Sequence, residues 1–253
     1  MVHFVGAGCG APDLITVRGQ KLLREADVII YAGSLVNPEL LKEAGPDCRI
    51  WDSSKMTLEE VLAVMEAAEK EGKTTVRLHT GDPCLYGAIR EQMDALEDLG
   101  VAFDVCPGVS SFAGAAACLK AELTLPDVSQ TVILTRMAGR TAVPDKESFR
   151  SLASHRSTMA VFLSAGMLKE MEQELKAAGW SKDAPAAIVY KATWPEEKIL
   201  RCTVSELAET AEKAGIRNTA MILLGDVLGD GSYERSRLYA ADFTTGYRKG
   251  KQP

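Results

Sequence analysis

The sequence is poor in the residues that mark several specialised classes of protein. Only 6% of its 253 residues are aromatic, its six cysteines form no Cys-x-x-Cys pair, and it contains three histidines. Such sparse cysteine and histidine argue against a disulfide-rich scaffold and predict that the protein itself binds no metal. No apolar run approaches the roughly 18 residues that span a bilayer, and the N-terminus lacks the charged start of a signal peptide. We therefore expect a soluble, cytoplasmic protein with no membrane partner.

Basic residues are outnumbered and are not clustered. The sequence has 29 Lys and Arg against 35 Asp and Glu, which gives a formal net charge of −6, and it has no Lys/Arg-rich run. Nucleic acid is therefore not an expected partner. An acidic substrate would need a local basic patch, because the overall charge repels it.

Hydrophobic patterning predicts an α/β protein of two domains. In the first half, apolar runs bounded by Gly or Pro alternate with stretches of helical period, which is typical of β-α-β crossovers and a mostly parallel sheet. In the second half, several connections are too short for helical crossovers, which indicates a mixed sheet. Expected strands are residues 2–5, 28–31, 75–78 and 101–106, then 131–135, 159–163, 187–190 and 221–224, with further candidates at 49–51, 199–202 and 238–240. We place the N-terminal domain at residues 1–122 and the C-terminal domain at residues 123–253.

Local signals predict where several helices begin. Thr57 and Glu60 form a capping box before an apolar stripe, and Asn37 precedes a proline as a typical N-cap. Other helices are expected from about residue 16, over residues 85–99 and over residues 111–119.

Three glycine-containing loops follow predicted strands. Residues 6–11, Gly-Ala-Gly-Cys-Gly-Ala, match the dinucleotide fingerprint, but no acid ends the second strand as a Rossmann fold requires. Residues 80–87 contain Gly81-Asp82-Pro83, and residues 107–111 read Pro-Gly-Val-Ser-Ser. Open α/β folds bind ligands at the carboxyl edge of their parallel strands, where these loops are expected. For Asp82 two interpretations stay open: it accepts hydrogen bonds from a ligand, or it caps a helix that begins near Cys84.

These loops, with Asp13-Leu14-Ile15-Thr16 after the first, resemble those of the tetrapyrrole methyltransferases. Residues 31–38, 135–140 and 189–195 resemble most closely the members that methylate C-11 of precorrin-4 or cobalt-precorrin-4. The resemblance implies two α/β domains with a ligand cleft between them and a homodimeric assembly. It also implies transfer of a methyl group from S-adenosylmethionine, which leaves as S-adenosylhomocysteine, to the macrocycle in cobalamin biosynthesis.

The resemblance also implies which side chains form the site. Because the sulfonium of the cofactor carries its own leaving group, alignment of the reacting atoms matters most, and the sequence singles out no catalytic base. Asp82 is the candidate for positioning. Expected cofactor contacts are Gly81, Asp82, Leu85, Ser110, Ser111, Leu163, Tyr190, Ala192, Ala220 and Met221. Expected contacts with the substrate's carboxylates are Arg136, Arg140 and Lys191.

Several alternatives stay open. The chain could methylate another precorrin position or another tetrapyrrole, or it could be a nucleotide-dependent oxidoreductase or a non-catalytic binding module. The three basic side chains could form ordinary surface salt bridges, and Trp194 could stack on the macrocycle or pack internally. The first loop has Cys9 and Ala11 where the family usually has Pro and Asp, which leaves its conformation open. Whether the substrate already carries cobalt is not readable from the sequence.

Overall fold

The computed structural model describes residues 1–251, which form two compact units. The first comprises Met1–Leu119 and Val189–Ile199, and the second comprises residues 120–188 and 200–251. The last two residues of the predicted C-terminal domain lie outside the described residues. The grouping of Val189–Ile199 with the N-terminal residues is not predicted by the sequence. The boundary predicted at 122/123 stays a prediction.

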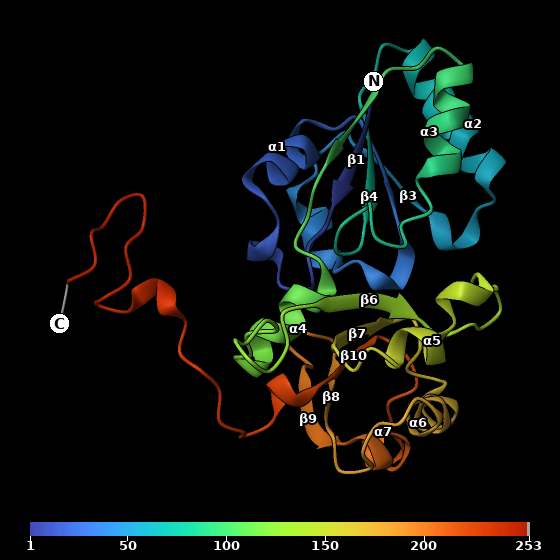
Figure 1. Ribbon diagram of the computed structural model, residues 1–253. Coiled ribbons are helices and arrows are strands. Elements are labelled where there is room, and N and C mark those ends of the chain that lie inside the picture. Colours follow the sequence, from blue (N-terminus) through green and yellow to red (C-terminus); the bar gives the residue numbers. More distant parts are fainter. Residues whose placement is uncertain (252–253) are drawn as a thin grey trace. The chain divides into compact units, whose positions relative to one another are not determined.

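The first unit is built on the predicted parallel sheet (Figure 1). Its five strands have the order β3-β2-β4-β1-β5, and the pairs β2–β3, β2–β4, β1–β4 and β1–β5 are all parallel. The register aligns Gly6, the end of β1, with His79, the end of β4. The strands are β1 Val2–Gly6, β2 Val28–Tyr31, β3 Arg49–Asp52, β4 Thr75–His79 and β5 Phe103–Cys106.

Helices cover both faces of this sheet (Figure 1). On one face, Leu23 of α1 (Val17–Glu25) packs in a core with Ile29. On the other, Met65 of α2 (Leu58–Lys70) and Leu96 of α3 (Arg90–Asp98) pack in a core with Phe4. The neighbouring strands β1 and β4 therefore lead into helices on opposite faces. Ligands of open α/β sheets bind at such a switch point.

The helix starts follow their local signals. Thr16 caps α1, since its hydroxyl accepts a hydrogen bond from Gly19 N at 3.0 Å. The predicted capping box of α2 is confirmed, with Thr57 N donating to Glu60 Oε2 at 2.8 Å and Glu60 N donating back to the threonine hydroxyl. The fourth helix of this unit, α4, covers Ser111–Leu119 as predicted. Short 3-10 helices lie at Pro12–Leu14, Gly33–Leu35, Pro38–Glu43 and Ser53–Lys55.

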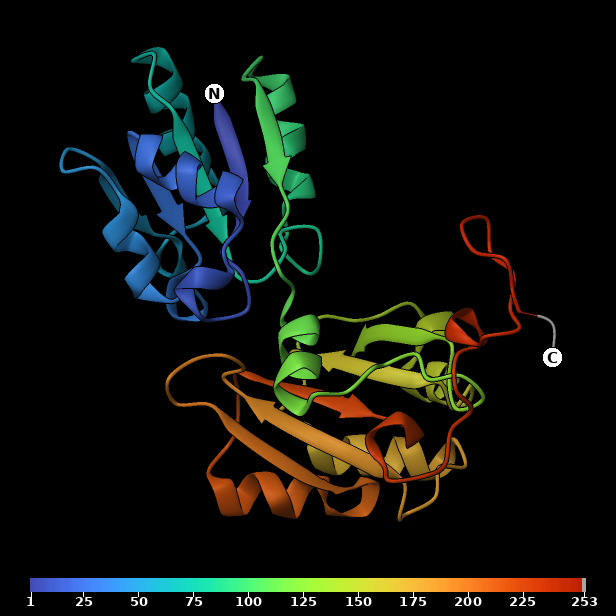
Figure 2. The ribbon, with the colours of Figure 1, turned by 90° about the vertical axis from the view of Figure 1, so that its left-hand side faces the viewer.

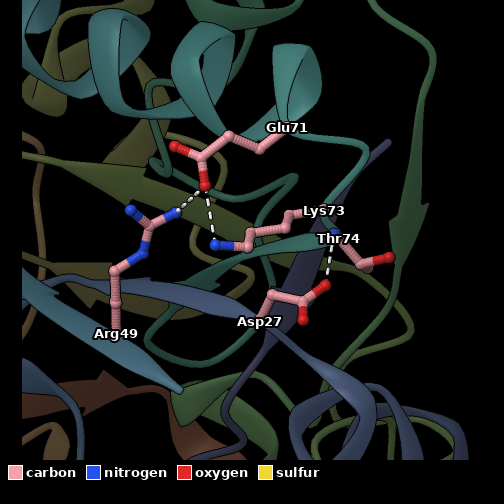
Figure 3. Close-up of polar contacts among 5 residues, drawn as sticks. All are labelled: Asp27, Arg49, Glu71, Lys73 and Thr74. Atoms are coloured by element: carbon pink, nitrogen blue, oxygen red, sulfur yellow. Dashed lines mark hydrogen bonds and ion pairs between the residues drawn. The ribbon is translucent and has the colours of Figure 1, made fainter. Parts of the chain in front are cut away.

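Charged side chains join the strands at the amino edge of the first sheet (Figure 3). Asp27, just before β2, accepts a hydrogen bond from Thr74 N at 2.8 Å. Glu71, at the end of α2, accepts from Arg49 at 3.1 Å and from Lys73 at 2.6 Å through the same carboxylate oxygen. Both cations lower the pKa of Glu71, Lys73 through its hydrogen bond most. This edge is held by exposed polar side chains.

The second unit contains the predicted mixed sheet (Figure 2). Its strand order is β6-β7-β10-β8-β9, with β6 parallel to β7 and β10 antiparallel to β7. Helices α6 and α7 pack against each other along one face of the sheet (Figure 2). The strands are β6 Val132–Arg136, β7 Thr158–Phe162, β8 Pro185–Tyr190, β9 Lys198–Thr203 and β10 Ala220–Leu224. The helices are α5 Phe149–Ala153, α6 Leu168–Ala177 and α7 Leu207–Ala214, with 3-10 helices at Asp145–Glu147, Val204–Glu206, Asp226–Leu228 and Arg237–Tyr239.

The start of one predicted helix and one predicted strand are wrong. The helix expected over residues 85–99 begins only at Arg90, because Tyr86 and Ala88 have positive φ angles of 57° and 50°, which an α-helix cannot contain. The strand expected at residues 238–240 is instead the 3-10 turn Arg237–Tyr239. Ser236 caps that turn by accepting from Leu238 N. In both places local backbone geometry overrides the side-chain pattern.

Candidate cofactor-binding site

The loops after β1 and β4 are joined by backbone hydrogen bonds at the carboxyl edge of the first sheet. Gly8 N donates to Gly81 O at 3.2 Å, and Gly81 N donates back to Gly8 O at 2.8 Å. One residue earlier, Ala7 N donates to His79 O at 2.7 Å. The first two predicted loops therefore form one structure.

The third loop packs onto the other two through glycines. A Cβ atom on Gly6 would lie 2.6 Å from both Gly108 Cα and Gly81 O, and one on Gly108 would lie 2.2 Å from Gly81 O. Real side chains do not make such contacts, so this edge accepts only glycine at these positions. Backbone amide and carbonyl groups consequently line the switch point between β1 and β4, where the connections lead to opposite faces of the sheet.

Asp82 links two of the loops. Its Oδ1 accepts from Cys84 N at 2.8 Å, and its Oδ2 accepts from Gly108 N at 3.0 Å. The first of these bonds closes a turn rather than capping a helix, because α3 begins only at Arg90. The Cys84 thiol also donates to this carboxylate, so three of about four acceptor positions are used within the protein and about one is left for a ligand. A cofactor contact by Asp82 stays a prediction.

The segment after β8 lies directly on the first loop. A Cβ on Gly10 would lie 2.2 Å from Trp194 Cδ1 and 2.5 Å from Ala192 O. Thr193 Oγ1 accepts from Ala11 N at 2.9 Å, and the buried Asn37 donates from Nδ2 to Gly10 O at 2.9 Å. This contact packs the Trp194 ring against the glycine loop and brings Ala192 beside the loop. A contact of Ala192 with the cofactor stays a prediction.

Sequence reasoning missed Asn37 and Thr193 as partners of the glycine loop. Asn37 does cap the 3-10 helix Pro38–Glu43, because its Oδ1 accepts from Glu39 N at 3.0 Å. The side-chain amide has a second function that local capping rules do not reveal. The only feature of the sequence that points to Thr193 is its place in the Lys-Ala-Thr-Trp-Pro stretch, which resembles the family.

Other predicted cofactor residues of the first unit lie near these loops or next to them in the chain. Ser110, 8% exposed, and Ser111 are at the start of α4, and Ser111 N would lie 3.4 Å from a Cβ on Gly81. Leu85 lies in the turn before α3, not one turn into a helix. Tyr190 ends β8. Their contact with a cofactor stays a prediction.

The predicted substrate residues differ in the contacts that they make within the protein. Arg136 donates hydrogen bonds to the carbonyls of Met137, Thr141 and Ala142, at 3.2, 3.0 and 2.7 Å, so its guanidinium holds the loop that follows β6. Arg140, in that loop, is exposed. Lys191 Nζ lies 3.5 Å from Glu196 Oε2 and 5.0 Å from the centre of the Trp194 ring.

The remaining predicted cofactor residues belong to the second unit. Leu163 follows β7 with φ of 54°, and its side chain is 69% exposed. Ala220 and Met221 begin β10, where the methionine side chain is 5% exposed. Their role stays a prediction.

Strand β4 carries buried polar side chains toward the loops. Arg77, 7% exposed, donates from Nε to Gln92 Oε1 and from an Nη to Ile30 O, and burial lowers its pKa to about 10. His79, 4% exposed, has no hydrogen-bond partner for its Nε2 within the described residues. Burial and, secondarily, the nearby Arg77 charge lower the pKa of His79 to about 3. The imidazole is therefore neutral at physiological pH.

Residues 1–251 contain no group of three or more His, Cys, Asp or Glu arranged to hold a metal ion. Across the same residues, no helix is both long and apolar enough to cross a membrane.

Comparison with known proteins identifies the family. Residues 1–208 match the model of the tetrapyrrole (corrin/porphyrin) methylases. The chain belongs to this family, and it is a methyltransferase. The resemblance inferred from the loop motifs is therefore confirmed.

Close relatives match over nearly their whole length. The chain is 51% identical over 248 residues to cobalt-precorrin-4 C(11)-methyltransferase of Methanocaldococcus jannaschii, covering 98% of this chain and 96% of that protein. It is 42% identical over 250 residues to precorrin-4 C(11)-methyltransferase of Pseudomonas aeruginosa, covering 99% of both.

Solved structures agree with the fold. An X-ray structure of the cobalamin biosynthetic enzyme cobalt-precorrin-4 methyltransferase, CbiF, matches with a TM-score of 0.88 and 50% identity over 90% of this chain and 95% of that one. Uroporphyrin-III C-methyltransferase from Thermus thermophilus, solved with S-adenosylhomocysteine, matches with a TM-score of 0.75 and 28% identity over 90% and 92% of the two chains. The predicted α/β fold class is confirmed.

Proposed function

We propose that this methyltransferase transfers a methyl group from S-adenosylmethionine to C-11 of precorrin-4 or cobalt-precorrin-4. The observation that carries the proposal is the 51% identity, over 98% of the chain, to a relative named for that reaction. The glycine-lined carboxyl edge of the first sheet supplies the physical basis, because it offers a ligand backbone groups at close range.

The residues at this edge fit an S-adenosyl group. Cys9 and Gly10 are buried, and within the described residues their backbone N–H groups have no acceptor. Buried N–H groups are nearly always hydrogen-bonded, so two adjacent free ones suit a ligand rich in oxygen and nitrogen acceptors. Gly81 and the remaining acceptor position of Asp82 would contribute to the same site. When bound, S-adenosylmethionine supplies a methyl group activated by its positive sulfur.

The contribution of the protein is alignment. The loops are held together by backbone contacts and by Asp82, so they keep their shape without a ligand. Little conformational entropy is therefore lost when the cofactor binds. A rigid site of this kind fixes the methyl donor in line with the attacking carbon, which is the main requirement of this reaction.

The direct test combines binding with product analysis. Calorimetric titration should show micromolar binding of S-adenosylhomocysteine and none of NADH. Incubation of precorrin-4 or its cobalt complex with ¹³C-methyl S-adenosylmethionine should then add one labelled methyl group, which NMR should place at C-11. A label on another carbon would show a different methyl-acceptor position, and binding of NADH alone would favour the oxidoreductase alternative.

The cobalt complex is the favoured form of the substrate. Two relatives named for cobalt-precorrin-4 are 51% and 50% identical to this chain, whereas relatives named for precorrin-4 from Pseudomonas aeruginosa and Sinorhizobium are 42% and 41% identical. We expect the ratio kcat/KM to be higher for the cobalt complex in parallel assays. A higher ratio for the metal-free substrate would reverse this assignment.

A comparison of Arg136, which ends β6, with Arg140, in the loop that follows, tests which side chain binds the carboxylates of the macrocycle. Arg140→Ala should raise KM for the macrocycle and leave the melting temperature unchanged, because Arg140 is exposed. Arg136→Ala should also lower the melting temperature, because it removes three hydrogen bonds to the loop backbone. An unchanged KM in both variants would contradict a substrate role for this loop.

We also propose that the enzyme is a cytoplasmic homodimer. Light scattering coupled to size-exclusion chromatography should give twice the chain mass of 27.2 kDa. A mass of one chain at micromolar concentration would contradict the dimer.

A further inference from the structure

The two polar atoms of one peptide bond in the first loop are both held by side chains. The bond between Gly10 and Ala11 has its carbonyl oxygen bound by Asn37 Nδ2 at 2.9 Å. Its N–H donates to Thr193 Oγ1, also at 2.9 Å. The side chains approach opposite ends of the peptide dipole, so together they fix the orientation of its plane. We call Asn37 and Thr193 the peptide clamp.

This peptide needs a clamp because of the residue that precedes it. Gly10 has φ of 156°, a conformation that side-chain-bearing residues rarely adopt, and glycine rotates there at little cost. Without partners, the peptide between Gly10 and Ala11 could turn over and carry its carbonyl to where its N–H had been. The Gly10 N–H, proposed above to face the cofactor, belongs to the preceding peptide. Without the clamp, the loop would lose the anchored end that holds this preceding peptide in place.

Thr193 is itself held in place. Its φ is 67°, which is unusual for a β-branched residue, and its N–H donates to Glu197 Oε2 at 2.6 Å. The same oxygen accepts from Cys118 Sγ, on α4, at 2.8 Å. Burial, and then this hydrogen bond, raise the pKa of the Cys118 thiol to about 11, so the thiol stays a donor. Cys9, which belongs to the glycine loop, contacts the same hydroxyl, with its Sγ 3.6 Å from Thr193 Oγ1.

We propose that the peptide clamp positions the glycine loop for the cofactor, so that Asn37 and Thr193 set cofactor affinity without touching the cofactor. The proposal rests on the proposed function in taking this loop as part of the S-adenosyl site. A loop that spends only a fraction of its time in the competent orientation binds with an affinity reduced by that fraction. The clamp keeps the fraction near one.

The variants separate the clamp from the rest of the fold. Thr193→Val keeps the branched shape but removes the acceptor, and Thr193→Ser keeps the hydroxyl. Asn37→Asp keeps the acceptor that caps Glu39 N but removes the donor to Gly10 O. Thr57→Val is the matched control, because it removes a threonine hydroxyl that caps α2 in the same unit.

We expect Thr193→Val and Asn37→Asp each to weaken S-adenosylhomocysteine binding about tenfold, the effect of about one hydrogen bond. The KM for S-adenosylmethionine should rise in step, and kcat at saturating cofactor should change less than about twofold. Thr193→Ser should restore affinity and Thr57→Val should leave it unchanged. The double variant should lose much less than the product of the single losses, because either loss already frees the same peptide.

Binding by Thr193→Val within about twofold of the wild type, or an equal loss in Thr57→Val, would overturn the proposal. Hydrogen exchange of the Ala11 amide provides a readout without ligand. It should be protected in the wild type and in Thr193→Ser and should exchange faster in Thr193→Val. A wild type that binds no S-adenosylhomocysteine refutes the proposed function, whereas an Ala11 amide unprotected in the wild type refutes the clamp itself.

Discussion

The two edges of the first sheet are held by different means. At the amino edge, charged groups on exposed side chains join the strands, as in the contacts of Glu71 with Arg49 and Lys73 (Figure 3). At the carboxyl edge, Gly6, Gly81 and Gly108 meet backbone to backbone. Exposed ion pairs tolerate substitution because water and salt already screen them. A contact between backbones tolerates none, since any side chain would occupy the space of the neighbouring chain.

Two histidines at opposite ends of neighbouring strands show the same difference. His3, near the start of β1, lies 2.7 Å from Asp104 through its Nδ1. His79, at the end of β4, is buried with an Nε2 that has no partner in the described part of the chain. The contrast holds for the histidines and not for every polar group, because Thr75 Oγ1 at the start of β4 is also buried without a partner in the described part of the chain. The free ring nitrogen of His79 is the unsatisfied group next to the glycine loops, where a ligand could accept or donate a hydrogen bond.

The largest expected effect is a glycine substitution at the carboxyl edge. Gly108→Ala should destabilise the protein by about 3 kcal/mol, because the new Cβ would lie 2.2 Å from Gly81 O and the backbones must separate. Gly72→Ala, near the amino edge, is the control. It has a φ of 69° with nothing within 4 Å of the new Cβ, so only backbone strain of roughly 1 kcal/mol is expected. Urea unfolding measures both, and equal losses would contradict the contrast between the edges.

A smaller effect is expected at Asp82. Asp82→Ala removes the acceptor for two backbone N–H groups and should destabilise the protein by about 1–2 kcal/mol. Affinity for S-adenosylhomocysteine should fall by about fivefold or more, because the loops after β4 and β5 separate. Asp82→Asn keeps one acceptor oxygen, so its stability and its affinity for S-adenosylhomocysteine should lie between those of the wild type and of Asp82→Ala. If affinity is unchanged while stability falls, Asp82 serves the fold alone.

The next prediction concerns pH. The pKa of His79 in the folded protein is about 3, below its ordinary value of 6.5, so the unfolded chain takes up a proton that the folded protein refuses. Stability from this residue is complete above about pH 6.5 and declines as pH falls toward 3, by up to about 1.4 kcal/mol per pH unit. Urea unfolding from about pH 7.5 to 5 should show this slope in the wild type and a shallower one in His79→Leu. Parallel slopes would show that His79 is not held neutral.

The smallest effect is expected at the amino edge. Glu71→Gln removes the shared acceptor of Arg49 and Lys73, all of them on the exposed surface. Stability should change less than in any variant above, and the difference should disappear in high salt. Affinity for S-adenosylhomocysteine should be unchanged. A loss of cofactor binding in this variant would show that the two edges are coupled.

Local chemistry in the sequence was sufficient for much of the fold. The strands of the parallel sheet, the start of α1, the capping box of α2 and the extent of α4 followed from side-chain period, capping residues and glycines, because these act over a few residues. The position of the glycine loops at the carboxyl edge followed in the same way. The pattern failed where the backbone leaves the regular regions, as at Tyr86 and Ala88 before α3.

The sequence by itself thus determined the family, the sheet type and the presence of the glycine loops. Only the tertiary structure decided how those loops are held. Ala11 and Thr193 are 182 positions apart, and no local rule pairs them. The return of residues 189–199 to the first unit places Trp194 on Gly10 and Thr193 on the next peptide. Packing between distant segments determines that arrangement, because it depends on which surfaces meet and not on the residues that neighbour each other in the chain.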